Sequence, residues 1–198
     1  MISDSEAWLH CDNKNLWIFD KLLLSKHLGY VCGPSGVDVP SPGTYIIRPC
    51  MNLLGMGIGA KFVDLVDSTD HLPPGHFWCE VFSGQHVSVD YYRGNQILAV
   101  EATRDSGSPL WKFSKWTRLD NVQFQFPEIL FYLFQDFDYI NAEYISGNLI
   151  ELHFRTNPDF EYKNSEAIPV WDEEDINIPE GYRYVSNPDY KRKGFYIK

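Results

Sequence analysis

The amino-acid sequence predicts an α+β fold in which antiparallel hairpins dominate over helices. Residues 86–100 and 139–155 alternate apolar and polar side chains around short turns, which is the pattern of half-buried β-hairpins. The glycine-rich loop at residues 55–59 stands between two strand-like segments, so it predicts a hairpin flap and not the strand-to-helix turn of a Rossmann domain. The chain has 198 residues, a length that fits one domain or two closely joined lobes.

The composition indicates a folded chain and argues against two classes of partner. Hydrophobic residues make up 44% of the sequence and aromatic residues 16%, which is enough to bury a core. The formal net charge of -10 argues against binding to nucleic acid or to anionic lipid, because both require clustered Lys and Arg. No segment approaches the roughly 20 apolar residues that a membrane-spanning helix requires, so we expect a soluble protein with no membrane partner.

The four cysteines stand far apart in the sequence, at Cys11, Cys32, Cys50 and Cys79. They form no CxxC pair and follow no secretory leader, so neither a disulfide framework nor a zinc cage is indicated. We expect reduced, mostly buried thiols in a cytoplasmic protein.

The first regular element is predicted to be a short helix after Asp20, whose carboxylate can cap its N-terminus. Leu22, Leu23 and Leu28 recur at helical spacing. Gly29 then stands where a helix C-terminus favours a left-handed residue.

Two strands are predicted to flank the glycine-rich loop. Residues 44–48 are β-branched or aromatic before Arg48, and Pro49 closes this strand. After the loop, residues 60–63 return as the second strand.

The second hairpin, at residues 76–100, contains a strand with two chemically different faces. Val87 and Val89 share one face, whereas His86, Ser88 and Asp90 share the other.

A helix is predicted at residues 127–137, because apolar side chains fall on one stripe and a proline is well tolerated in a first turn. The stripe consists of Ile129, Leu130, Leu133 and Phe134. A hairpin follows, with strands at residues 139–145 and 149–155 joined by a turn at 146–148. Beyond Pro158 the sequence turns irregular, and we expect this tail to wrap the outside of the fold.

The last hairpin carries the strongest group of candidate site residues. Glu151, His153 and Arg155 alternate along one strand and therefore project from the same face. A three-residue turn places Glu143 directly opposite Glu151. Two carboxylates about 5 Å apart at their Cβ atoms repel each other, and a divalent cation between them converts the repulsion into binding.

Two interpretations of this hairpin remain open from the residues alone. A turn of two or four residues reverses the parity of the pairing and sends one glutamate to solvent. The glycine loop is similarly ambiguous. Gly55, Gly57 and Gly59 allow backbone N–H groups to approach phosphate oxygens beside Arg48, but a glycine-rich turn chosen only for its shape is the commoner case.

Four segments of the sequence, taken in order, resemble the ATP-grasp superfamily. These are Asp20-Lys21 opening a helix, residues 45–49 leading into the glycine flap, residues 80–90, and residues 150–155. The resemblance covers residues 20–155 and implies two small lobes, each with an antiparallel sheet and helices, that hold a nucleotide in the cleft between them.

The resemblance implies contacts to ATP from three parts of the chain. Lys21 matches a lysine that contacts ATP, and Arg48 stands where the family has a second lysine that grips the phosphates. Arginine keeps the positive charge but changes reach and geometry. The adenine is contacted through backbone groups near a glutamate, a position that Glu80, Val81 and Phe82 fit. His86 stands near the ribose position.

The family ends its site with a Glu-x-Asn-x-Arg motif that binds metal ions bridging the phosphates. Glu143, Glu151 and Arg155 match this pattern, and His153 replaces the asparagine. Imidazole is a poorer ligand than an amide oxygen for Mg²⁺ and a better one for Mn²⁺ or Zn²⁺. Either the metal differs and His153 is one of its ligands beside Glu143 and Glu151, or His153 serves the substrate. The implied cofactors are ATP and Mg²⁺, or Mn²⁺ in its place, with Arg155 and Arg48 as catalytic cations.

The implied organisation is a domain at residues 20–160, with a flap lobe at about 30–78 and a larger lobe at about 80–160. Residues 1–19 and 161–198 are expected to be extensions packed on it. Enzymes of this family usually carry a substrate domain ahead of the grasp, so a partner protein or a second copy is expected to supply one. The implied activity is ATP-dependent ligation of a small-molecule or peptide carboxylate to an amine or thiol. The alternative is a degenerate module that binds a nucleotide or a protein without turnover.

Overall fold

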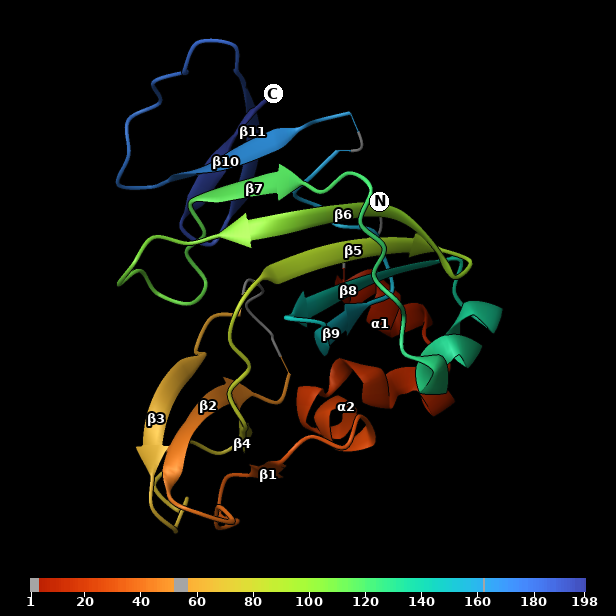
Figure 1. Ribbon diagram of the computed structural model, residues 1–198, viewed down its shortest axis with the longest axis vertical. Coiled ribbons are helices and arrows are strands. Elements are labelled where there is room, and N and C mark those ends of the chain that lie inside the picture. The colour runs from red at the N-terminus through yellow and green to blue at the C-terminus, as the bar shows by residue number, and fades with distance from the viewer. Residues whose placement is uncertain (1–3, 52–56, 162) are drawn as a thin grey trace.

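The structure is a computed structural model that describes residues 4–51, 57–161 and 163–198. Two antiparallel sheets and four short helices form the described part of the chain. The α+β class predicted from the sequence is therefore confirmed. Figure 1 shows the smaller sheet below the larger one, with helix α2 beside both.

The smaller sheet contains four strands in the order β1-β4-β2-β3. Their bounds are β1 Cys32–Pro34, β2 Gly43–Pro49, β3 Lys61–Leu65 and β4 His76–Cys79. Strands β2 and β3 are the two sides of the predicted flap. Ile47 is fully buried beneath the sheet, and Tyr45 packs edge-on against Trp78 with 5.3 Å between ring centroids. This apolar core holds the flap together.

The larger sheet contains eight strands in the order β11-β12-β10-β7-β6-β5-β8-β9. Their bounds are β5 His86–Tyr92, β6 Asn95–Thr103, β7 Lys115–Arg118, β8 Tyr139–Ile145, β9 Asn148–His153, β10 Glu166–Trp171, β11 Arg183–Asp189 and β12 Arg192–Ile197. Val87 and Val89 face the apolar core, as the alternation predicted. Ser88 and Asp90, on the opposite face, are also buried. Their side chains therefore belong to a buried polar network and are not exposed to solvent.

The helices are α1 Asp4–His10, η1 Asn13–Phe19, α2 Lys21–His27 and η2 Glu128–Gln135. The predicted cap on α2 is present, because the Asp20 carboxylate accepts hydrogen bonds from the backbone N–H groups of Leu22 and Leu23 at 2.8 and 3.1 Å. Helix α2 contacts both β1 of the smaller sheet and β9 of the larger one. Residues at its start can therefore reach the last hairpin.

The helix expected at residues 127–137 has a different geometry. It is a 3₁₀-helix, η2, with three residues per turn. Side chains three apart then share a face, so Leu130 and Leu133 are fully buried while Ile129 is 56% exposed. The stripe expected from α-helical spacing was therefore wrong at Ile129.

The irregular tail expected beyond Pro158 is also wrong, because β10, β11 and β12 extend the larger sheet. Pro169 weakened the strand signal in this segment. In the structure Pro169 pairs with Phe195 of β12 and lies beyond the short pairing of β10 with β7, which involves Glu166 and Ala167. The proline therefore interrupts no hydrogen bond to β7.

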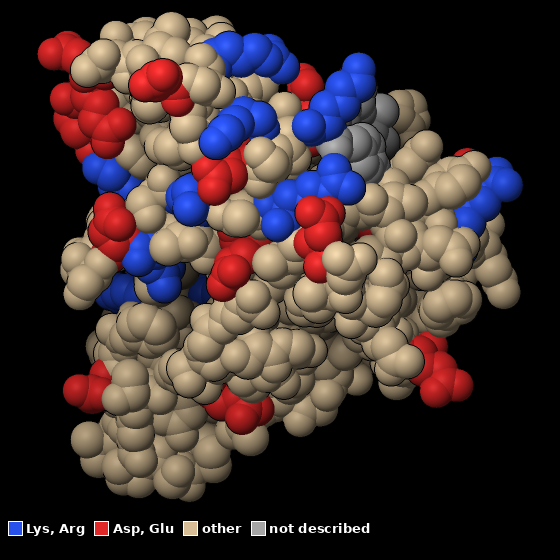
Figure 2. Space-filling view, turned by 45° about the horizontal axis from the view of Figure 1, so that its top comes forward, with Lys and Arg blue, Asp and Glu red and all other residues tan. Residues whose placement is uncertain are grey.

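No helix among the described residues has the length and apolar character needed to cross a membrane. On the face shown in Figure 2, Lys and Arg side chains are interspersed with Asp and Glu and do not form one continuous basic patch.

Candidate functional site

The last hairpin places Glu143 opposite Glu151 through a turn and a bulge. Its turn has two residues, Ser146 and Gly147, with φ values of +48° and +82°, and not the three expected. A two-residue turn alone would place Glu143 opposite Ile150. A register shift at Ile150 restores the pairing of Glu143 with Glu151. The two carboxylates therefore share one side of the strand pair, as predicted.

Lys21 forms a buried ion pair with Glu151. Its ammonium lies 2.9 Å from the Glu151 carboxylate, and the two side chains are 5% and 13% exposed. The Asp20 cap fixes the start of α2 and thereby points Lys21 at β9. The pair neutralises one of the two opposed glutamates.

His86 is the partner of the other glutamate. Its Nε2 atom lies 3.3 Å from the Glu143 carboxylate. Burial raises the pKa of Glu143, but the hydrogen bond and charge of His86, together with the charges of His153 and Lys21, outweigh burial and lower the pKa overall. Glu143 is therefore ionised at neutral pH.

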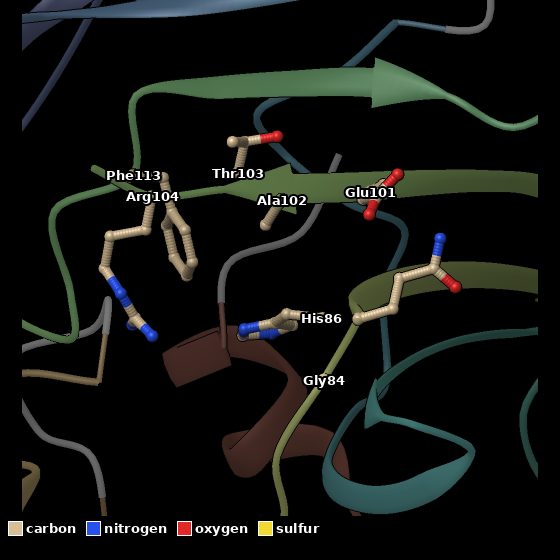
Figure 3. A pocket seen from close by; sticks show the side chains of 8 residues that line it. Gly84, His86, Glu101, Ala102, Thr103, Arg104 and Phe113 are labelled. Carbon is tan, nitrogen blue, oxygen red and sulfur yellow. The ribbon is translucent and has the colours of Figure 1, made fainter. Parts of the chain in front are cut away.

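A cavity of about 390 Å³ opens beside His86. Figure 3 shows His86, Arg104 and Phe113 around the same hollow. The His86 ring packs edge-on against Phe113 with 5.1 Å between centroids. The cavity thus joins an imidazole, a guanidinium and an aromatic ring, which suits a ligand that is part polar and part flat.

A second cavity of about 710 Å³ lies between the two sheets' loops. It is lined by Gly59, Lys61 and Phe62 from the flap and by the β6–β7 loop from Arg104 to Trp111. Arg104 also lines the first cavity, so the two hollows are neighbours.

The glycine loop is described only in part. Gly57 and Gly59 have φ values of +67° and +89°, in the left-handed region where glycine is favoured. Gly55 lies outside the described residues. The phosphate-binding role expected of the three glycines stays a prediction.

Arg48 connects the flap to the last hairpin. Its Nη1 atom donates to the backbone oxygen of Ile150 at 3.3 Å, and its guanidinium lies 5.1 Å from the centroid of the Phe77 ring. Its buried Nε–H has no hydrogen-bond partner among residues 4–51, 57–161 and 163–198. Because buried polar groups are normally paired, this orphaned donor fits an anion that binds beside it.

The expected adenine segment begins with a structural contact. The Glu80 carboxylate accepts a hydrogen bond from the Val31 N–H at 2.8 Å, and the Glu80 N–H donates to the Val31 oxygen at 2.9 Å. These bonds fix the segment that joins the two sheets. Val81 is 37% exposed, and Phe82 packs edge-on against Tyr30. The glutamate side chain thus holds the connection, which leaves backbone groups of the next residues for a base.

His153 and Arg155 contact a residue that the sequence did not indicate. The Arg155 guanidinium donates to the Asp4 carboxylate from Nε and Nη2, each at 2.7 Å. His153 Nδ1 lies 3.1 Å from Asp4, and its Nε2 lies 3.5 Å from Glu151. Burial raises the pKa of Asp4, but the hydrogen bonds and charges of His153 and Arg155 hold the pKa well below its usual range. Asp4 is separated from Arg155 by 151 positions, and no local pattern links the two.

The residues present fit a divalent cation through two carboxylates. In residues 4–51, 57–161 and 163–198, no group of three or more His, Cys, Asp or Glu side chains is arranged to hold a metal ion. Mg²⁺ beside a nucleotide needs only one or two carboxylates, with phosphates and water completing its shell. Glu143 and Glu151 supply two carboxylates, but Lys21 and His153 face the two oxygens of Glu151, and His86 faces one oxygen of Glu143. Both nitrogens of His153 also face carboxylates. The metal contact expected of His153 stays a prediction.

A buried polar network lies beneath the site and was also missed. The Asp90 carboxylate accepts hydrogen bonds from the Asn141 amide and the Asn157 N–H, each at 2.8 Å. Both asparagines also contact Ser88. Asn157 lies two positions after Arg155, so Asp90 anchors the segment after β9 that carries Arg155. The strand predicted to run to residue 155 therefore ends two residues earlier.

The Asp90→Asn substitution is expected to change how stability depends on pH. Burial raises the pKa of Asp90 from 3.8 to about 6, although the Asn157 and Asn141 hydrogen bonds favour the ionised form. A raised pKa gives stability that is full below pH 3.8 and is lost as pH rises through 6. Between pH 4 and pH 7 the difference in unfolding free energy should shift in favour of the variant by up to about 3 kcal/mol. Urea denaturation of both proteins at the two pH values measures this shift, and a constant difference would contradict it.

Sequence comparisons and structural comparisons give different results. No model of a protein family matches the chain, and no curated protein matches it. The structure of N5-carboxyaminoimidazole synthetase from Staphylococcus aureus in complex with ADP matches with a TM-score of 0.54 and 12% identity, over 99% of this chain and 73% of that one. A protein assigned to the ATP-grasp superfamily from Archaeoglobus fulgidus gives a TM-score of 0.48 and 14% identity, over 92% of this chain and 64% of that one. D-alanine–D-alanine ligase from Bacillus anthracis gives 0.41 and 13%, over 71% and 58%.

The fold and the site define a class of α+β proteins in which loops of two antiparallel sheets line a common cavity. More particularly, the chain has the ATP-grasp fold. At 12% identity the likeness establishes the fold alone. The chain spans 64% of the length of the Archaeoglobus fulgidus protein.

Proposed function

We propose that this protein binds ATP with a divalent cation and uses it to activate a carboxylate for attack by an amine or a thiol. The observation that carries the proposal is the pairing of Glu143 with Glu151 beside the buried Lys21, on an ATP-grasp fold. The structural neighbour from Staphylococcus aureus is a synthetase in complex with ADP. This neighbour supports the proposal that the chain binds a nucleotide, and it does not identify the acid substrate.

The proposed phosphate contacts come from both lobes. Arg48 offers a buried Nε–H that has no partner in the part of the chain that the structure describes, and Lys21 lies at the start of α2. Gly57 and Gly59, with Gly55 before them, allow the flap backbone to approach the phosphates. Glu143 and Glu151 hold the cation, which when bound neutralises phosphate charge as the γ-phosphoryl group is transferred.

The remaining residues orient the base, the sugar and the acid. The backbone around Val81 and Phe82 receives the adenine, and His86 lies on the cavity proposed for the ribose. Arg155 has a planar fork of donors that matches a carboxylate or an acylphosphate. These groups position reactants and stabilise developing charge, so the protein itself forms no covalent bond.

Thermal and chemical denaturation with ligand tests the nucleotide site. ATP with Mg²⁺ or Mn²⁺ at 100 times its dissociation constant is expected to raise the free energy of unfolding by about 2.7 kcal/mol. ATP with EDTA serves as the control that separates metal-dependent binding from nonspecific effects. If no nucleotide changes the stability, the proposals of nucleotide binding and of ligation are both wrong.

A nucleotide-binding module without turnover is the second candidate. The contact of Asp4 with Arg155 and His153 favours it, because these two side chains are already engaged within the chain. ADP release with a panel of small acids, amino acids and short peptides, each paired with amines and thiols, distinguishes the two. Stabilisation by ATP without ADP release across the panel supports the module.

A further inference from the structure

The contact between α1 and the end of β9 joins distant parts of the chain. Asp4, the first residue of α1, lies against His153 and Arg155, which are 149 and 151 positions away. Helix α1 has seven residues, of which Ala7 is buried. Leu9 is 76% exposed. Trp8 packs edge-on against Phe19 with 5.1 Å between ring centroids. A helix this short, with Ala7 and Trp8 as its apolar contacts, can detach at a modest free-energy cost.

Asp4 occupies the donors that Arg155 would offer to a ligand. The Nε and Nη2 atoms of Arg155 both donate to the Asp4 carboxylate, and Nη1 donates to the Thr156 oxygen at 3.1 Å. All three guanidinium nitrogens are therefore engaged. His153 adds a third contact to the Asp4 carboxylate at 3.1 Å.

Arg155 binds the Asp4 carboxylate in the same geometry with which a guanidinium group binds a ligand carboxylate. Two parallel N–H···O bonds from a guanidinium fork are the usual way in which proteins bind a carboxylate or a phosphate. The Asp4 carboxyl oxygens stand at those two positions. An external oxyanion can use the fork only when Asp4 has left it.

We propose that Asp4 is an autoinhibitory latch, which fills the oxyanion position of Arg155 and His153 until α1 detaches. The ligand that replaces it is an oxyanion, from either the acid substrate or the nucleotide phosphates. The identity of that ligand rests on the proposed function, whereas the latch itself rests on the contacts of Asp4.

Only molecules in which α1 is detached can bind the oxyanion at Arg155 and His153. The apparent affinity is therefore the intrinsic affinity multiplied by the fraction of such molecules. Charge-assisted hydrogen bonds are among the stronger ones in proteins. Asp4 is 43% exposed on its side chain, so solvent weakens the contact. We expect removal of the carboxylate charge to tighten oxyanion binding about tenfold.

The Asp4→Asn variant tests the latch in the full chain. An NMR titration that follows the Arg155 Nε–H signal measures the binding of sodium pyrophosphate alone and of sodium acetate alone. A gain of about tenfold over the wild type for either probe supports the latch. A gain for pyrophosphate assigns the position to nucleotide phosphates, and a gain for acetate assigns it to the acid substrate. Unchanged affinity for both probes overturns the proposal.

Two matched variants separate the latch from other causes. Asp12→Asn removes one negative charge from an exposed residue near α1 and should leave both affinities at the wild-type level. Asp4→Glu keeps the charge and should remain latched. If either variant gains as much as Asp4→Asn, the effect comes from general charge or from altered packing of α1, and the latch is refuted.

Titration with ATP and Mg²⁺ keeps this proposal distinct from the proposed function. If the wild type binds ATP but Asp4→Asn shows no gain in affinity for either probe, the proposed function is supported and the latch proposal is wrong. If Asp4→Asn gains affinity for a probe but neither protein binds ATP, the latch proposal is supported and the proposed function is wrong.

Discussion

Replacing Lys21 by methionine is expected to lower the free energy of unfolding by about 3 kcal/mol. Lys21 and Glu151 are 5% and 13% exposed and lie 2.9 Å apart, so the substitution leaves a carboxylate buried without its counterion. Removing one partner of such a pair is far more harmful than removing both. Urea denaturation at pH 7 measures the loss.

Two further variants test whether the pair is the cause. Lys26→Met makes the same chemical change on an exposed residue of the same helix, and we expect its effect to stay within about 0.5 kcal/mol. The double variant Lys21→Met with Glu151→Gln removes both charges and should recover most of the stability. If the double variant is less stable than Lys21→Met alone, the buried pair is not what the single substitution breaks.

Local signals in the sequence were sufficient for the elements that surround the site. The Asp20 cap predicted the start of α2 and hence the place of Lys21. Alternation along residues 149–155 predicted that Glu151 and His153 share a face. Such features depend on neighbours within a few positions, which the sequence displays directly.

The pairing of Glu143 with Glu151 was predicted correctly through an incorrect turn. The sequence favoured three turn residues, whereas the structure has two turn residues and a bulge at Ile150. Both arrangements insert one residue between the same partners. A bulge leaves little trace in composition, because its position is set by twist and packing of the whole sheet.

The missing parts of the site depend on contacts between distant segments. Asp4 meets Arg155 across 151 positions, and Asp90 meets Asn157 across 67. An aspartate near the start of a chain looks like any exposed residue until the sheet places Arg155 beside it. Similarly, β10 became identifiable as a strand only once β12 was seen to pair with it along Pro169.

Replacing Glu151 by glutamine is expected to weaken the binding of ATP in the presence of Mg²⁺ by at least about 100-fold. The amide keeps the size of the side chain but removes the charge opposite Glu143, so one of the two proposed carboxylate ligands is lost. Isothermal titration calorimetry at fixed Mg²⁺ measures the change. The temperature must be low enough to keep the variant folded, because Lys21 loses its counterion.

A matched control and a metal-free titration decide what the loss means. Glu180→Gln makes the same change at an exposed position in the β10–β11 connection and should bind as the wild type does. In EDTA the wild type should fall to the affinity of the Glu151→Gln variant, because the carboxylate acts through the cation. If the variant still binds ATP as the wild type does with Mg²⁺, Glu151 holds no metal. Its pairing with Lys21 would then be purely structural, and the ligase proposal would lose the contact on which it stands.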